Sequence, residues 1–191
     1  MLDTPLRRLA APALAPVAAR LARVGASANL LTVAGFGLGL GAFAAVATHH
    51  YWWGFGLIAA NRLSAGVDGP LARLTKADDL GAFLEPVFGI IVAGSIPLAF
   101  ALADPSRALA CAFLIFGFVA SGSASLAFVA IAARRGMISI RPGLIESTET
   151  FLALALACAL SDWFSVIAYI LGVLCFASAG MRIAEAFLRF A

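Results

Sequence analysis

The stretch of residues 108–133 contains no charged side chain, and this feature most restricts what the chain can fold into. A transmembrane helix needs about 20 consecutive apolar residues, so the stretch is long enough to cross a bilayer. Of the whole chain, 63% of residues are hydrophobic and 12% are charged, with a mean hydropathy of +1.01. Soluble domains carry about 25% charged residues, so the composition excludes that class and predicts an all-α, polytopic membrane protein.

Further apolar runs, separated by polar or turn-forming segments, predict six transmembrane helices. We expect these spans at residues 29–48, 51–74, 82–103, 108–133, 144–160 and 163–187. Residues 75–80 are expected to form a short exposed connection. Glycines recur at every second position from Gly35 to Gly41, and small residues at such spacing permit close helix contact.

The first 24 residues differ from the rest because four arginines are interspersed with Leu, Ala and Pro. Residues 1–24 are too interrupted to span a bilayer, and an interfacial segment on the inner leaflet fits best. A frayed basic tail is the alternative. Residues 25–191 are expected to form one six-helix membrane domain.

The distribution of basic residues predicts the orientation in the membrane. Six spans place both termini on one side, and twelve of the thirteen Lys and Arg residues fall on that side, with Arg107 opposite. Cytoplasmic loops carry an excess of Lys and Arg, so both termini are expected in the cytoplasm. This orientation explains the net charge of +3 without nucleic-acid binding. We expect a multi-pass protein of a prokaryotic cytoplasmic membrane.

Most of the polar chemistry lies between residues 61 and 89. The positions that define its pattern are Asp68, Gly69, Ala72, Arg73, Gly81 and Glu85. Their spacing resembles the signature of the CDP-alcohol phosphatidyltransferases, Asp-x-x-Asp-Gly-x-x-Ala-Arg followed by Gly-x-x-x-Asp-x-x-x-Asp. The chain departs from that signature at its carboxylates, because the four acidic positions are occupied by Ala65, Asp68, Glu85 and Gly89.

The resemblance implies a six-helix phosphotransferase fold, a homodimer and a reaction. In the family, four carboxylates hold two divalent cations at the pyrophosphate of a CDP-linked donor such as CDP-diacylglycerol. The last Asp is thought to take the proton of an acceptor alcohol, which attacks the β-phosphorus and displaces CMP. Residues three or four apart share a helix face, so each helix can offer its carboxylates to one cleft.

The reduced motif predicts a reduced site. Asp68 and Glu85 are the expected catalytic residues and metal ligands, and one Mg²⁺ or Mn²⁺ ion is more plausible than two. Nucleotide contacts are expected from Asp68, Gly69, Ala72, Arg73 and Gly81. Weaker candidates for the acceptor or a headgroup are Arg134, Arg135, Arg141, Glu146 and Glu149.

Two functions remain open at this point. One is a phospholipid-biosynthesis transferase that moves a substituted phosphate from a CDP-linked lipid to an alcohol. The other is a catalytically silent homologue that binds nucleotide or lipid, or regulates an active relative. Asp68 and Glu85 also have a structural interpretation, as partners of nearby basic residues. Asn61 and Ser64 are weak candidates for additional ligands.

Overall fold

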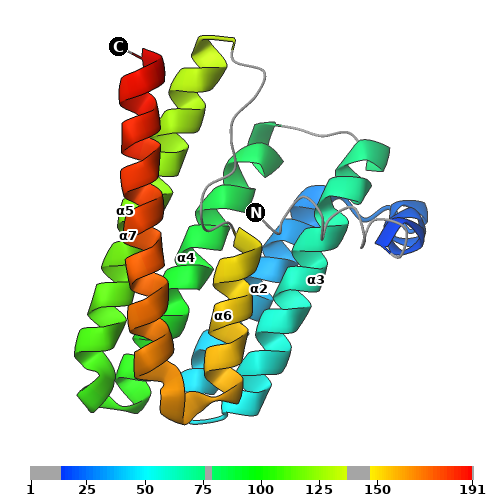
Figure 1. The fold of residues 1–191 in the computed structure, drawn as a ribbon. Helices are drawn as coiled ribbons and strands as arrows, with labels where there is room; N and C mark the ends of the chain where they lie inside the picture. The colour runs from blue at the N-terminus through cyan, green and yellow to red at the C-terminus, as the bar shows by residue number, and fades with distance from the viewer. Residues whose placement is uncertain (1–13, 76–78, 137–146, 191) are drawn as a thin grey trace.

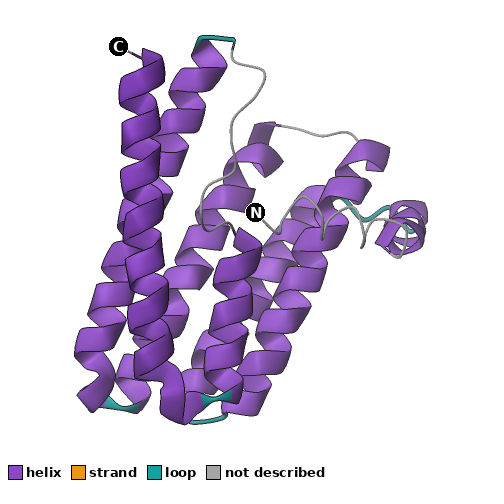
Figure 2. Ribbon diagram, viewed as in Figure 1, coloured by secondary structure: helices purple, strands orange, loops and turns teal. Residues whose placement is uncertain are grey.

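The computed structural model describes residues 14–75, 79–136 and 147–190, and these are helical apart from short turns (Figures 1 and 2). The long elements are α2 (Ala28–Ala47), α3 (Tyr51–Thr75), α4 (Asp79–Ala103), α5 (Ala108–Arg134), α6 (Ser147–Ala159) and α7 (Phe164–Phe190). Single 3-10 turns precede α5 and α7. No strand occurs in the described ranges, and the all-α prediction is confirmed.

The helices run alternately up and down in one bundle (Figure 1). The α2 helix packs against α3 and α4, α5 packs against α4 and α7, and α6 packs against α3 and α7. Residues 48–50, 104–107 and 160–163 connect helices at one end, here called the turn end. The opposite end, where α3 ends and α4 begins, is called the motif end (Figure 1).

Four of the described helical segments are long and apolar enough to cross a membrane, and they contain α2, α4, α5 and α7. The chain is therefore a multi-pass membrane protein. The α3 helix is less apolar because it contains Arg62, Asp68 and Arg73. The α6 helix has 13 residues, or roughly 20 Å of helix, against a hydrocarbon core of about 30 Å. Six full spans therefore stay a prediction.

The observed helix ends differ from the predicted ones mainly around the motif. The exposed connection expected at residues 75–80 was wrong at both ends, because Thr75 belongs to α3, and Asp79 and Leu80 belong to α4. Asp79 lies in the first turn of α4, where the helix dipole favours a negative charge. The predicted start of the fifth span, at residues 144–146, lies outside the described residues.

Close packing at the motif end depends on small residues of α2. A Cβ on Gly35 would lie 3.2 Å from Ser64 Oγ of α3, and one on Gly39 would clash with Val92 of α4. The prediction of close glycine contacts is confirmed at these two positions. It is wrong at Gly37, where a Cβ would meet no atom within 4 Å.

Aromatic rings tie the helices together along the bundle. Near the turn end, Phe100 stacks between Tyr51 and Phe164, with ring centroids 5.4 Å and 4.0 Å apart, which joins α3, α4 and α7. Closer to the motif, Phe36 of α2 stacks on Phe88 of α4 at 4.1 Å. The positions of α3 and α4 are thus set by ring contacts between the motif and the turn end.

A short helix at residues 14–23 lies beside the motif end, with its axis across the bundle (Figure 1). Its Ala18 is buried with Val67 and Leu71 of α3. The N-terminal segment therefore packs on the same turns of α3 that carry Asp68. Its placement at the membrane interface stays a prediction.

Candidate functional site

Asp68 of α3 is buried at the motif end, at 8% relative exposure. Its Oδ2 accepts a hydrogen bond of 3.0 Å from Thr32 Oγ1 of α2. Its Oδ1 is buried without a hydrogen-bond partner among the described residues. Leaving a buried carboxylate oxygen unsatisfied costs free energy, so this atom is suited to receive a ligand.

Glu85 of α4 is exposed, and it lies close enough to Asp68 for the two negative charges to repel each other. The fold therefore brings together one carboxylate from each of the two motif helices. A cation between them would offset the repulsion and supply the missing partner of Asp68 Oδ1.

Each motif helix also contains a proline next to its carboxylate. Pro70 follows Asp68 by two positions in α3, and Pro86 directly follows Glu85 in α4. Proline has no N–H, so the carbonyl groups four residues earlier, Gly66 and Ala82, lose their usual helical partners. Backbone carbonyl oxygens are suitable ligands for hard cations, so we expect these two carbonyl groups to be available to a ligand.

The other expected nucleotide contacts lie on the same two helices. Gly69 and Arg73 are exposed, and Ala72 and Gly81 are half-buried. A Cβ added to Gly69 would meet no atom within 4 Å, which leaves room for a ligand to approach the backbone. The binding role of these residues stays a prediction.

The donor set contains two carboxylates, and its binding of one hard cation stays a prediction. Among the described residues, no group of three or more His, Cys, Asp and Glu side chains is placed to hold a metal ion. Asp68 and Glu85 would therefore hold one Mg²⁺ or Mn²⁺ ion, with water or carbonyl oxygen completing the shell. Ala65 and Gly89 offer no side-chain ligand for a second ion.

Asn61 and Ser64 are engaged in helix packing. Asn61 Nδ2 donates to the Gly35 carbonyl at 2.7 Å, and its Oδ1 accepts from Arg62 Nε at 2.9 Å. Ser64 Oγ donates to the Leu31 carbonyl at 3.2 Å. Both side chains therefore hold α3 against α2.

Arg62 reaches away from α3 towards α6. Its Nη1 donates to Ser147 Oγ at 2.9 Å, and its guanidinium carbon lies 3.5 Å from the centroid of the Phe151 ring. This cation–π contact and hydrogen bond position α6 beside the motif helices.

The candidate acceptor residues that the structure describes lie at the end of α5 and at the start of α6. Arg135 donates to the carbonyl groups of Arg189 and Phe190 at 3.1 and 3.0 Å, and so holds the ends of α5 and α7 together. Arg134 is exposed and Glu149 is half-buried in the first turn of α6. Arg141 and Glu146 lie outside the described residues.

Two polar features were missed by sequence reasoning. Thr32 lies 36 positions before Asp68, and no local spacing signals their contact. Arg182, which is buried, and Glu185, which is half-buried, form an ion pair of 3.0 Å on α7. Their three-residue separation on a helix could have indicated this pair.

Comparison with known proteins gives the same fold and family. The family model described as CDP-alcohol phosphatidyltransferase matches residues 26–176. The curated inner membrane protein YnjF of Escherichia coli K12 is 34% identical over 98% of this chain and 96% of its own length.

Two solved structures of phosphatidylinositol phosphate synthase from Mycobacterium tuberculosis share the fold. The structure with CDP-DAG bound has a TM-score of 0.76 and 19% identity, covering 90% of this chain and 92% of that one. The complex with manganese and citrate has a TM-score of 0.76 and 21% identity, covering 91% and 88%. Because the family model matches residues 26–176, which are more than half of this chain, the chain belongs to the CDP-alcohol phosphatidyltransferase family.

Proposed function

We propose that the chain binds a CDP-linked lipid, such as CDP-diacylglycerol, at the motif end and slowly transfers its substituted phosphate to an alcohol, releasing CMP. The observation that carries this proposal is the buried Oδ1 of Asp68, which has no hydrogen-bond partner among the described residues, with the negative charge of Glu85 within electrostatic range. Such a pair is suited to hold one divalent cation beside a pyrophosphate. The solved relative's complex with CDP-DAG supports a lipid of that class.

The chain's own residues would divide the work between binding and proton transfer. Arg73 and the open backbone at Gly69 would contact the nucleotide. A bound divalent cation would neutralise charge on the pyrophosphate. Glu85, the exposed carboxylate, would hold the cation through one oxygen. In place of the missing last Asp, its other oxygen would accept the proton of the alcohol as the new phosphorus–oxygen bond forms and the bond to CMP breaks.

The missing carboxylates limit the rate of this reaction. The position at which the family has its last Asp is Gly89, one helical turn beyond Glu85. Loss of a positioned general base lowers rates by roughly 10²- to 10⁴-fold. The same observation supports the second candidate function, a silent homologue that binds nucleotide or lipid without turnover.

The cellular setting is part of the proposal. We place the chain in a bacterial inner membrane, in line with the name of its curated relative. Both termini and the motif end face the cytoplasm, because twelve of thirteen basic residues are expected on that side. A homodimer is the assembly that the family resemblance implies.

The testing experiment is CMP release by detergent-solubilised protein from CDP-diacylglycerol, with Mn²⁺ or Mg²⁺ and a panel of alcohols. We expect metal-dependent release that falls at least about 100-fold in Asp68→Asn. Asp79→Asn is the matched control, because Asp79 is exposed at the start of α4. Release that is unchanged in Asp68→Asn would contradict the proposed site.

Thermal stability separates the two candidate functions if no CMP is released. Stabilisation of the inert protein by CMP that requires Mn²⁺ would support the silent nucleotide-binding homologue. Absence of both release and stabilisation, beside an active relative in the same assays, would overturn nucleotide binding altogether.

A further inference from the structure

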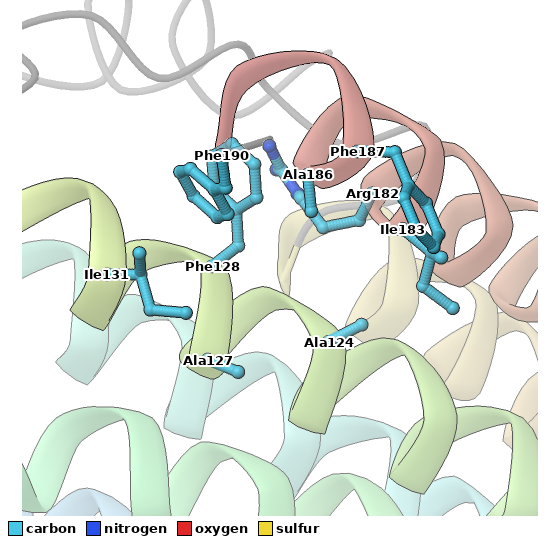
Figure 3. A pocket seen from close by; sticks show the side chains of 9 residues that line it. All are labelled: Ala124, Ala127, Phe128, Ile131, Arg182, Ile183, Ala186, Phe187 and Phe190. Atoms are coloured by element: carbon cyan, nitrogen blue, oxygen red, sulfur yellow. The ribbon is translucent and has the colours of Figure 1, made fainter.

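The α5 and α7 helices enclose an apolar groove near the ends at which both helices project beyond the rest of the bundle (Figures 1 and 3). Its volume is about 470 Å³. The lining residues are Ala124, Ala127, Phe128, Ile131, Arg182, Ile183, Ala186, Phe187 and Phe190. All of them belong to α5 or α7, so the groove is separate from the α3–α4 site.

The groove is hollow because small and large side chains alternate along it. Ala124 and Ala127 leave space on α5, while Phe128, Phe187 and Phe190 form walls around that space (Figure 3). These residues present alkyl and aromatic carbon to whatever occupies the groove.

Arg182 contributes to the lining without making it strongly polar. Its Nη1 donates to Glu185 Oε2 at 3.0 Å, and its guanidinium carbon lies 4.9 Å from the centroid of the Phe128 ring. Glu185 also pairs with Arg189 at 2.9 Å. The charge of Arg182 is therefore compensated within the protein, and the hollow is suited to a hydrocarbon chain.

Positive charge surrounds the end of the groove. The described ends of α5 and α7 contain four arginines and one glutamate, which are Arg134, Arg135, Arg182, Arg189 and Glu185. Arg134 is exposed and has no hydrogen-bond or ion-pair partner among the described residues. Arg135 is exposed too, and it pairs with carbonyl groups instead of a carboxylate. An anionic group would be attracted to this end.

From this combination we propose that the α5–α7 groove binds one anionic phospholipid, with an acyl chain between Phe128 and Phe187 and the headgroup at Arg134 and Arg135. Both helices are long and apolar enough to cross the membrane, so lipid molecules would surround the groove. The lipid binds here as a ligand and is not consumed. This inference goes beyond the proposed reaction and does not depend on it.

Lipid-specific quenching of a single tryptophan tests the proposal. Phe187→Trp places a reporter at the groove after the three native tryptophans, Trp52, Trp53 and Trp163, are changed to Phe. The protein is reconstituted into phosphatidylcholine vesicles with a small fraction of brominated phosphatidylglycerol or brominated phosphatidylcholine. We expect the anionic lipid to quench the reporter at about fivefold lower mole fraction, an advantage that high salt removes.

The matched control retains Trp163 as the single tryptophan, which is exposed at the turn end. It should be quenched equally by both lipids. Ala127→Phe should fill the groove and abolish the anionic preference, whereas Ala112→Phe, on an exposed position of the same helix, should retain it. Equal quenching of the Phe187→Trp reporter by both lipids would overturn the proposal.

A cysteine variant tests the other possible occupant, a second copy of the chain. Cys111, Cys158 and Cys175 are buried, so Phe187→Cys introduces an accessible thiol at the groove. We expect no disulfide-linked dimer through this thiol in the same vesicles. Efficient cross-linking would show that another protomer covers the groove and would overturn lipid binding there.

Discussion

The α3–α4 pair and the α5–α7 pair both place charged side chains within helices at the motif end, but they compensate these charges differently. On α7, Arg182 and Arg189 each pair with one oxygen of Glu185, at 3.0 and 2.9 Å. Glu185 Oε1 accepts no hydrogen bond in the described ranges, but it has the guanidinium of Arg189 as an ion-pair partner. On α3, Asp68 has one oxygen bound to Thr32 and the other without a partner among the described residues.

The difference separates a structural charge cluster from a ligand site. A buried charge that is paired within the protein can be retained for stability or specificity alone. A buried carboxylate oxygen without a partner is better explained by a ligand that completes it. The comparison therefore supports the proposed metal and nucleotide binding at α3–α4, whereas the charges on α7 are paired with one another.

The largest expected effect comes from restoring the missing carboxylates at the α3–α4 site. Ala65→Asp with Gly89→Asp should raise CMP release by about 10²- to 10⁴-fold, because it returns a base and metal ligands. A Cβ at Gly89 would meet no atom within 4 Å, so the new side chain has room. Ala65→Asn with Gly89→Asn controls for side-chain size. An equal rate of CMP release in the Asp and Asn double variants would contradict this site geometry.

Breaking the paired cluster should instead affect stability. Glu185→Leu removes the carboxylate that pairs with the buried guanidinium of Arg182, and we expect a loss of about 3 kcal/mol in unfolding free energy. Denaturation in detergent measures it. Arg182→Leu with Glu185→Leu should recover most of the loss, while exposed Arg134→Leu should change stability by less than about 0.5 kcal/mol. A double variant as unstable as the single one would contradict the pairing.

A smaller effect is expected from the hydroxyl group that orients Asp68. Thr32→Val removes the donor to Asp68 Oδ2, and loss of such a supporting bond lowers metal affinity by about tenfold. Manganese titration followed by electron paramagnetic resonance measures the change. Thr48→Val, at the other end of α2, is the matched control. Unchanged affinity in Thr32→Val would show that Asp68 is positioned by other contacts.

The smallest effect concerns the turn end. The hydroxyl and backbone N–H of Ser106, and then Arg107, lower the pKa of the half-buried Asp104 carboxyl below its ordinary value. The folded-state pKa lies below the unfolded-state pKa. The resulting stability is therefore present above about pH 3.9 and is lost as the pH falls through the folded-state pKa.

Asp104→Asn should be less stable than the native protein at neutral pH, and this difference in stability should become smaller at low pH. Melting temperatures at pH 6 and pH 3 measure this, with Asp162→Asn, at the neighbouring turn, as control. A gap that widens on acidification would contradict the sign of the pKa shift.

Local patterns predicted the parts of the fold that depend on local chemistry. Charge-free runs located α2 and α5 to within about one residue, because the need for apolar length acts on contiguous residues. The motif spacing also predicted that Asp68 and Glu85 lie on two different helices, which are α3 and α4. The start of α4 at Asp79 was missed because polar residues near a helix start resemble a loop.

Contacts between distant segments had no comparable signal. The bond between Thr32 and Asp68, and the bonds from Arg135 to the last carbonyl groups of α7, join residues 36 to 55 positions apart. They depend on how the helices pack and not on sequence spacing. The same reason explains why the α5–α7 groove could not be anticipated from the alanines and phenylalanines that line it.

Manganese stoichiometry tests the central claim most directly. Electron paramagnetic resonance on the purified protein with saturating CMP should count one tightly bound Mn²⁺ per chain, and that ion should be lost in Asp68→Asn but retained in Asp79→Asn. Two tightly bound ions per chain, or one that remains in Asp68→Asn, would contradict a single-cation site built from Asp68 and Glu85.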